Sequence, residues 1–456
     1  MRVTRFSTIR GRKGPAPRVS QAFAIFFAVV LLAATTGLAS GSVRWHSGGG
    51  KKTGSGKTYS GHTSNSWRTT RTTVSSTTTP TTDAPPPTTT PTTDPTTTPP
   101  PPPPPTTTTT ATTVPTQPDP TGTGAAPTIK VVGNHLVTGA GDAVQLRGVN
   151  RPGPEYAAVE GWGIFDGPTN DDLSIAAMKS WNINSVRVPL NEDSWLGINV
   201  SNAYSGAPYR AAVVDYVNRL NANGIIAIVN LHFSAPGTSV PDDQNPMADE
   251  DHSPAFWKSV ASTFAGNHSV IFDIFNEPYP DNNQDTTAAW TCVRDGGTCP
   301  GVSYPTAGMQ ELVDVIRSTG ATQPLMIAGP EYAGDLDKWM QYEPSDPLQQ
   351  LVASVHIYGL PLDSPYRLSS TWDAFITPLT AQVPVVIGEF GDTNCTSAFS
   401  VPLMTWADAH GIGYTAWAWV TSNCANDPAL ITDYNGTPTP YGAGVRAHLL
   451  TLPKEW

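Results

Sequence analysis

The stretch Ile271-Phe272-Asp273-Ile274-Phe275-Asn276-Glu277-Pro278 places an apolar run directly before a polar Asn-Glu-Pro. A second run, Val385-Val386-Ile387-Gly388-Glu389-Phe390-Gly391, repeats this arrangement, and its glutamate follows Glu277 by 112 positions (389 − 277). Both runs predict buried β-strands that end in a carboxylate. Burying a carboxylate is costly unless it is paired or lines a site. The two runs therefore predict strands of one barrel whose carboxyl ends carry a pair of functional glutamates.

Further strand-like runs alternate with helical stretches over residues 127–456. Candidate strands end near Asn150, Pro189, Leu231, Phe275, Ala328, His356, Gly388 and Trp417. Runs such as 225–229 are continuously apolar, as in parallel strands that are covered on both faces. Val213, Val217 and Leu220 recur at helical spacing before Gly224, a natural helix stop. The sequence predicts an α/β fold, a (β/α)8 TIM barrel, with a small hairpin over 128–138 closing its floor.

The first 126 residues differ in composition from the rest of the chain. Residues 21–39 are apolar and follow six basic residues, which is the order of a secretory signal cut after Ala39. An uncleaved membrane anchor is the alternative interpretation of this segment. Residues 40–126 are first basic and then Thr/Pro-rich, and they predict a disordered linker. The chain is therefore expected to be secreted or extracellular, with residues 1–126 as a candidate tether to a membrane or cell wall.

Charge is divided unevenly along the chain. Residues 1–126 hold 12 of the 26 Lys and Arg but only 3 of the 37 Asp and Glu, so the remainder is net −20. Nucleic-acid binding requires clustered basic residues, so an acidic barrel argues against a nucleic-acid partner.

All four cysteines lie in the predicted barrel. An even count in an exported chain predicts two disulfides. Cys292 and Cys299 flank a tight Asp-Gly-Gly loop, which leaves Cys395 and Cys424 to pair.

Every predicted strand ends in polar or aromatic residues, which packing alone does not explain. The set comprises Arg187, His232, Asn276-Glu277-Pro278, His356, Tyr358, Glu389 and Trp417. In this order and context the chain resembles glycoside hydrolase family 5, the cellulase family of retaining β-glycanases. The resemblance covers about 320 residues and leaves the N-terminal 126 outside it.

The resemblance implies a role for each matching residue. Glu277 would be the general acid/base and Glu389 the nucleophile, with Arg187 holding the nucleophile ionised. Asn276, His232 and His356 would bind the sugar, and the histidines would also hold the acid/base. Tyr358 would orient the nucleophile, and Trp417 would stack under a sugar ring.

Several neighbouring residues leave alternatives open. Glu155, Glu192 and Glu331 are rival acids, and Trp419 rivals Trp417 because alternation along a strand puts both on one face. Trp162 and Trp195 are further candidates for sugar stacking. The acidic loop 242–251 could hold Ca²⁺, but its spacing is not that of an EF-hand, and a solvated loop is expected instead.

The sequence predicts a monomeric endo-β-1,4-glucanase that retains configuration, needs no cofactor or metal, and takes a β-glucan polysaccharide as substrate. A β-mannanase or another β-glycan hydrolase on the same barrel is the first alternative. A catalytically silent, wall-tethered glycan-binding module is the alternative from another class.

Overall fold

The computed structural model describes residues 124–168, 172–359, 368–392, 394–425 and 427–456. The expected leader over 1–39 and the linker up to residue 123 lie outside these residues. Within the described part of the chain, no helix is both long enough and apolar enough to cross a membrane.

Eight parallel strands form a closed barrel, as the sequence predicts. Each strand pairs with the next in chain order, and the last pairs with the first. The strands are β3 (Arg147–Asn150), β4 (Ser185–Asn191), β5 (Ile226–Phe233), β6 (Val270–Asp273), β9 (Leu325–Ala328), β10 (Leu351–Tyr358), β11 (Val385–Gly391) and β12 (Gly413–Ala416). All eight end within three residues of the predicted positions.

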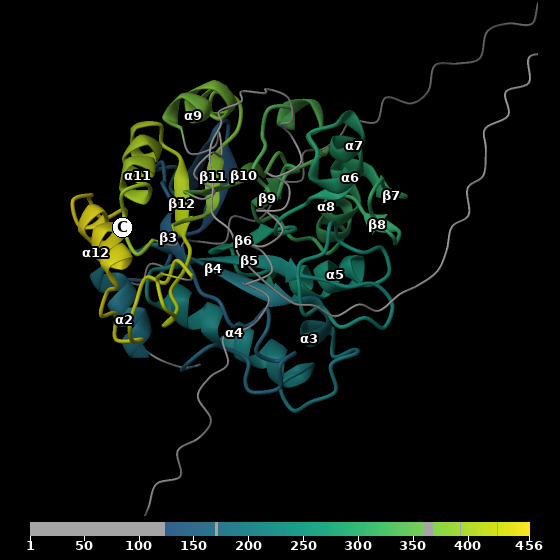
Figure 1. Ribbon diagram of the computed structural model, residues 1–456, viewed down its shortest axis with the longest axis horizontal. Coiled ribbons are helices and arrows are strands. Elements are labelled where there is room, and N and C mark those ends of the chain that lie inside the picture. Colours follow the sequence, from purple (N-terminus) through teal and green to yellow (C-terminus); the bar gives the residue numbers. More distant parts are fainter. Residues whose placement is uncertain (1–123, 169–171, 360–367, 393, 426) are drawn as a thin grey trace, which may run out of the picture. The chain divides into compact units, whose positions relative to one another are not determined.

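Helices surround the strands (Figure 1). They are α2 (Asp172–Ser180), α3 (Glu192–Leu196), α4 (Ala207–Ala222), α5 (Ser253–Phe264), α6 (Pro280–Asn283), α7 (Thr287–Asp295), α8 (Met309–Ser318), α9 (Ser369–Phe375), α10 (Thr377–Thr380), α11 (Ser400–Ala409) and α12 (Pro440–Leu449), with the 3₁₀ turn η1 (Trp339–Gln341). The buried face of α4 carries Val213, Val217 and Leu220, as their spacing predicts.

Although the strand sequences are continuously apolar, successive side chains still point to opposite faces of the barrel wall. On β5, Ile226 and Ile228 pack in a cluster inside the barrel floor, whereas Ala227 and Val229 join the larger core around the helices. A hairpin of β1 (Ile129–Val132) and β2 (His135–Thr138) contributes to the floor cluster, which confirms the predicted hairpin at the barrel floor. The next inward positions on β5 are polar, so the barrel interior changes from an apolar floor to a polar mouth.

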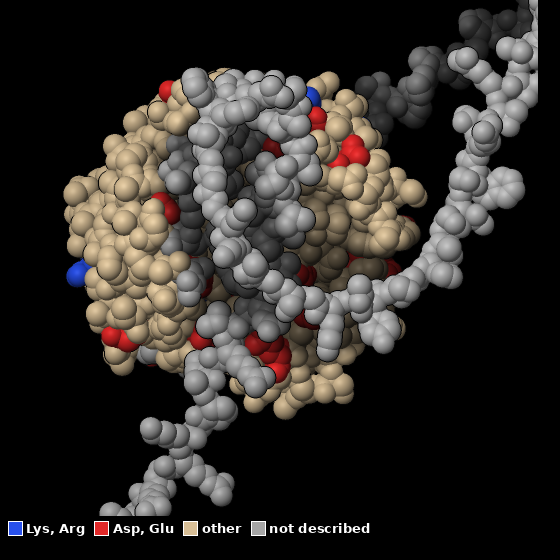
Figure 2. Space-filling model, in the orientation of Figure 1, with Lys and Arg blue, Asp and Glu red and all other residues tan. Residues whose placement is uncertain are grey.

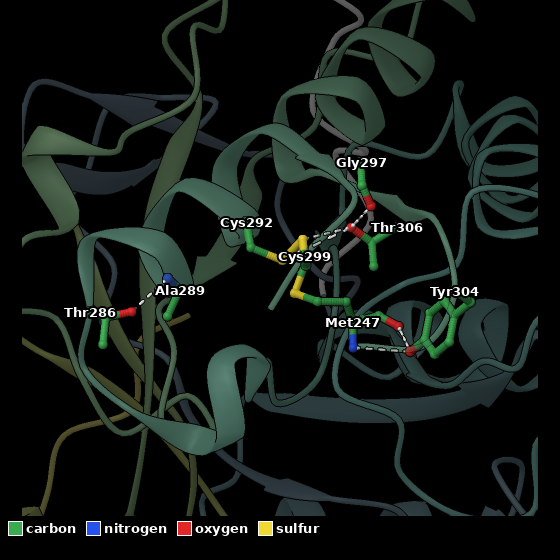
Figure 3. Close-up of a disulfide and its surroundings, with 8 residues drawn as sticks. All are labelled: Met247, Thr286, Ala289, Cys292, Gly297, Cys299, Tyr304 and Thr306. Atoms are coloured by element: carbon green, nitrogen blue, oxygen red, sulfur yellow. Dashed lines mark hydrogen bonds between the residues drawn. A yellow bond between two sulfur atoms is a disulfide. The ribbon is translucent and has the colours of Figure 1, made fainter. Parts of the chain in front are cut away.

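Two disulfides hold loops on the mouth side of the barrel, and their pairing is the predicted one. Cys292 of α7 is bonded to Cys299, and Cys395 after β11 is bonded to Cys424 after β12. Figure 3 shows the first of them beside Thr306, whose hydroxyl lies 3.2 Å from the Cys299 sulfur. Nearby, the Tyr304 hydroxyl donates to the carbonyl of Met247 at 2.6 Å. The disulfide loop therefore supports the segment that follows β5.

Both ends of the described barrel lie at its amino-terminal floor. The indole of Trp456 donates to the carbonyl of Gly224, just before β5, at 2.7 Å. A Cβ on Gly224 would lie 2.9 Å from the carbonyl oxygen of Gly124, so the first described residue is at the same place.

Candidate active site

Arg187 is the centre of a hydrogen-bond network at the mouth of the barrel. The side chain is fully buried and projects inward from β4. Its guanidinium donates to Asp273 at 2.7 Å, to Asn150 at 3.0 Å, to Glu389 at 2.7 Å and to Asn276 at 2.8 Å. A planar guanidinium suits these divergent acceptors because its donors are fixed in direction. One cation thereby fixes side chains from β3, from β11, and from β6 and the residues just after it.

Glu277 and Glu389 face each other across a histidine. The Nδ1 of His356 lies 2.8 Å from Glu277 Oε1 and 3.7 Å from Glu389 Oε2. One carboxylate oxygen from each glutamate and a nitrogen of His356 all lie within 4.8 Å of one another. These three donors are close enough to ligate an ion, but other side chains already form hydrogen bonds with both carboxylates.

Different partners hold the two carboxylates. Glu389 accepts from Arg187 and from the Tyr358 hydroxyl, which lies 2.6 Å from Oε2. Glu277 accepts from the amide of Gln244 at 2.9 Å. Burial raises the pKa of Glu277 well above its ordinary value, and the charge of Glu389 raises it further. Burial also raises the pKa of Glu389, but Arg187 and Tyr358 oppose that rise. Glu389 therefore ionises first, and Glu277 keeps its proton.

Both site histidines are neutral. Burial lowers the pKa of His356 and of His232 well below the ordinary value, and the charge of Arg187 adds to the effect. His232 is fixed by Asn230, which lies 3.0 Å from its Nδ1, and its ring stacks on Trp417 with centroids 5.6 Å apart. His356 contacts the predicted acid, and His232 supports the predicted stacking tryptophan.

Gln244 belongs to this site although sequence reasoning missed it. Besides its bond to Glu277, its side-chain oxygen accepts from the Asn276 amide at 3.2 Å, and its backbone carbonyl accepts from the Tyr279 hydroxyl at 2.7 Å. Asp273 was missed too, because it lies within the apolar run that β6 occupies. Asn150 was visible as a strand end but was left out of the predicted set.

Two predictions about tryptophans were wrong. Trp195 lies in the core around the helices, where its indole donates to Ser259 between α3 and α5, so it is turned away from the barrel mouth and cannot stack on a sugar there. Trp417 and Trp419 do not share a face, because β12 ends at Ala416 and the strand period stops there. Trp419 packs edge-on against Trp181 in the core around the helices. Trp162 is 45% exposed, and its role in stacking stays a prediction.

The rival acids are placed differently from the central pair. Glu155 is buried and accepts from the backbone of Gly153, and burial raises its pKa to about 8. Glu192 is buried beside Asp249, at the far end of the loop after β5. The prediction of a solvated loop over 242–251 was wrong in part. Asp242 and Asp243 are exposed as expected, but Asp249 is fully buried.

A model of the family described as Cellulase (glycosyl hydrolase family 5) matches residues 137–423, more than half of the chain. The chain belongs to this family. It is 25% identical over 282 residues to the β-mannanase/endoglucanase A of Caldicellulosiruptor saccharolyticus, covering 59% of this chain and 18% of that protein. It is also 25% identical over 256 residues to endoglucanase A of Butyrivibrio fibrisolvens, covering 55% of this chain and 49% of that protein. The family 5 chain thus spans about half or less of these relatives.

Solved structures of the same fold agree with the barrel. A β-glucanase from Saccharophagus degradans in complex with cellotetraose superposes with a TM-score of 0.53 at 19% identity, covering 72% of this chain and 94% of that one. A hyperthermophilic endocellulase from Pyrococcus horikoshii gives 0.54 at 18% identity, covering 71% of this chain and 99% of that one. At these identities the likeness extends to the fold alone.

Proposed function

We propose that this family 5 chain is an endo-β-1,4-glucanase that hydrolyses internal bonds of a β-glucan with retention of configuration. The observation that carries the proposal is the glutamate pair at the mouth of the barrel, with one oxygen from each carboxylate within 4.8 Å of the other. Retaining glycosidases hold their carboxyl groups about 5–5.5 Å apart, whereas inverting ones leave about 6.5–9.5 Å for a water.

The protonation states fit the two roles. Protonated Glu277 would give its proton to the leaving oxygen while ionised Glu389 attacks the anomeric carbon and forms a glycosyl-enzyme. Glu277, now a carboxylate, would take a proton from water, and that water would release the sugar and regenerate Glu389. Arg187 and Tyr358 hold the nucleophile ionised and oriented. Neutral His356 can share a hydrogen bond with Glu277 in either protonation state.

The proposed substrate rests on the relatives. Their names include endoglucanase and β-mannanase, and one structural neighbour was solved with cellotetraose. Trp417 packs against His232 and shares a cluster with Tyr358, which bonds Glu389, so a sugar that reaches this part of the mouth would stack on its indole. On the face shown in Figure 2, acidic side chains appear at several places and basic ones at few, which suits a neutral polymer better than an anionic one.

A substrate panel tests this proposal. The full chain is assayed on carboxymethyl-cellulose, mixed-linkage β-glucan, mannan and xylan, beside Glu277→Gln and Glu389→Gln. We expect cleavage of the glucans, with a loss of about 10²–10⁴-fold in Glu277→Gln. Nuclear magnetic resonance of the first product should show the β-anomer. A first product in the α-form would refute retention, and preferential mannan cleavage would favour the mannanase that the first relative's name suggests.

A further inference from the structure

A second group of carboxylates lies away from the catalytic pair. Glu192 and Asp193 open α3 directly after β4, and Asp249 stands near the end of the long loop between β5 and α5. All three side chains are fully buried. Asp251 and His252 follow on the same loop and are more exposed. We call these five residues the α3–α5 cluster.

Hydrogen bonds satisfy only part of the cluster. The Ser253 hydroxyl lies 2.5 Å from Glu192 Oε2 and 3.3 Å from Asp249 Oδ2, and the backbone N–H of His252 donates to Asp249 Oδ1. Burial raises the pKa of Glu192 well above its ordinary value, and its carboxyl shares a hydrogen bond with Asp249. Glu192 Oε1 and both carboxylate oxygens of Asp193 are otherwise buried without a hydrogen bond of normal geometry. The side chain of Asn199 lowers the pKa of Asp193, yet burial still raises that pKa to about 6. Buried acidic groups that contact mainly one another and have few other donors favour a positive partner.

No fixed cation supplies that partner within the described residues. No lysine or arginine there forms an ion pair with Glu192, Asp193, Asp249 or Asp251. The one basic neighbour is His252, whose Nδ1 lies 4.0 Å from Glu192 Oε1 and 3.7 Å from Asp249 Oδ1. These separations exceed hydrogen-bond length, so the imidazole leaves the carboxylates unsatisfied.

We propose that the α3–α5 cluster binds a hard divalent cation of the Ca²⁺ or Mn²⁺ type. One donor atom each from Glu192, Asp193 and His252 lie within 4.8 Å of one another, as do those of Asp249, Asp251 and His252. Oxygen ligands of Ca²⁺ lie about 2.3–2.6 Å from the ion, so donors on opposite sides of it are about 4.6–5.2 Å apart, which brackets the separation found here. Carboxylates select hard ions, and Mn²⁺ also accepts an imidazole.

The cation would connect two parts of the barrel mouth. Glu192 and Asp193 extend from β4, while Asp249 and Asp251 end the loop that carries Gln244. Asp251 already fixes the other end of that loop by accepting from the N–H of Gly237 at 2.8 Å. A bound ion would therefore hold the loop that positions Gln244 against Glu277. Binding itself is independent of the proposed substrate.

Cation binding is tested on the full chain after dialysis against a chelator. Equilibrium dialysis with Ca²⁺ and, separately, Mn²⁺ should give one tightly bound ion, and the melting temperature should rise by several degrees with that ion. Mn²⁺ binding without Ca²⁺ binding would assign His252 as a ligand. Failure of both ions to bind at millimolar concentration would overturn the proposal, whatever the activity of the enzyme.

Variants locate the ion. Asp193→Asn should abolish the cation-dependent rise in melting temperature while leaving the chelated protein at least as stable, because a buried charge is removed. Glu250→Gln, an exposed neighbour on the same loop, should keep the full rise. An undiminished rise in Asp193→Asn would place the ion elsewhere and overturn the assignment. If that variant does not fold, Asp249→Asn provides the same comparison.

Discussion

Replacing Gln244 with leucine should move the alkaline limb of the activity profile. The amide donates to Glu277 Oε2 at 2.9 Å and lowers the pKa of that carboxyl, against burial and the charge of Glu389. A hydrogen bond to a charged group contributes about 1.5–3 kcal/mol. Gln244 is only half-buried, so water replaces part of this, and we take the lower end. At about 1.36 kcal/mol per pKa unit, the pKa of Glu277 should rise by about one unit.

The sign of the shift follows from the proposed role of Glu277 as the general acid. The acid must be protonated, so activity is lost as pH rises through the pKa of Glu277, and Gln244→Leu should move that loss about one unit upward. The assay is kcat/KM against pH on a soluble β-glucan. Gln284→Leu is the matched control, because its exposed amide contacts only the local backbone. An unmoved or downward-shifted alkaline limb in Gln244→Leu would refute the reasoning.

Three further changes test the site and its supports. Gly388→Ala would place a Cβ 2.9 Å from the His356 ring and displace it, so kcat should fall about tenfold. In the control Gly266→Ala the added Cβ meets nothing within 4 Å, so kcat should stay unchanged. Equal kcat values in the two variants would contradict this steric effect on His356. Tyr358→Phe removes the hydroxyl that donates to Glu389, so the pKa of Glu389 should rise. The acid limb of the pH–activity profile should therefore move to higher pH, and an unmoved acid limb would count against this. Replacing both Cys395 and Cys424 with serine should lower the free energy of unfolding in urea by about 3–4 kcal/mol, as expected for a loop of this length; a change below 1 kcal/mol would show that the bond adds little.

The barrel was predictable because its strands are buried on both faces and therefore read as continuous apolar runs. Strand ends were placed to within three residues, since each run stops where polar side chains reach the mouth. Trp195 was misjudged for a local reason. β4 ends at Asn191 and α3 begins at once, which turns the indole inward toward α5. A residue just past a strand end can leave the mouth where a helix begins at once, as Trp195 does, or stay at the mouth, as Glu277 does after β6.

The side chains proposed to be catalytic were visible in the sequence, but the residues that support them were less so. Arg187 lies on β4 and Glu389 on β11, and Glu277 follows β6 by four residues, so the barrel topology brings them together. Gln244 lies in an irregular loop whose path no periodicity describes. Asp273 is an inward residue inside an apolar run, and only its bond to Arg187 reveals what it does. The burial of Asp249 likewise depends on how the loop folds back on α3.

Both ends of the described barrel meet beside Gly224, on the side opposite the glutamate pair. Attachment through either end, to a bead, a surface or a fused partner, would therefore leave the mouth facing outward. A bulky insoluble polymer could then approach the carboxylates without passing the support. An attachment made in the loops after the strands would instead stand between the polymer and the reacting groups.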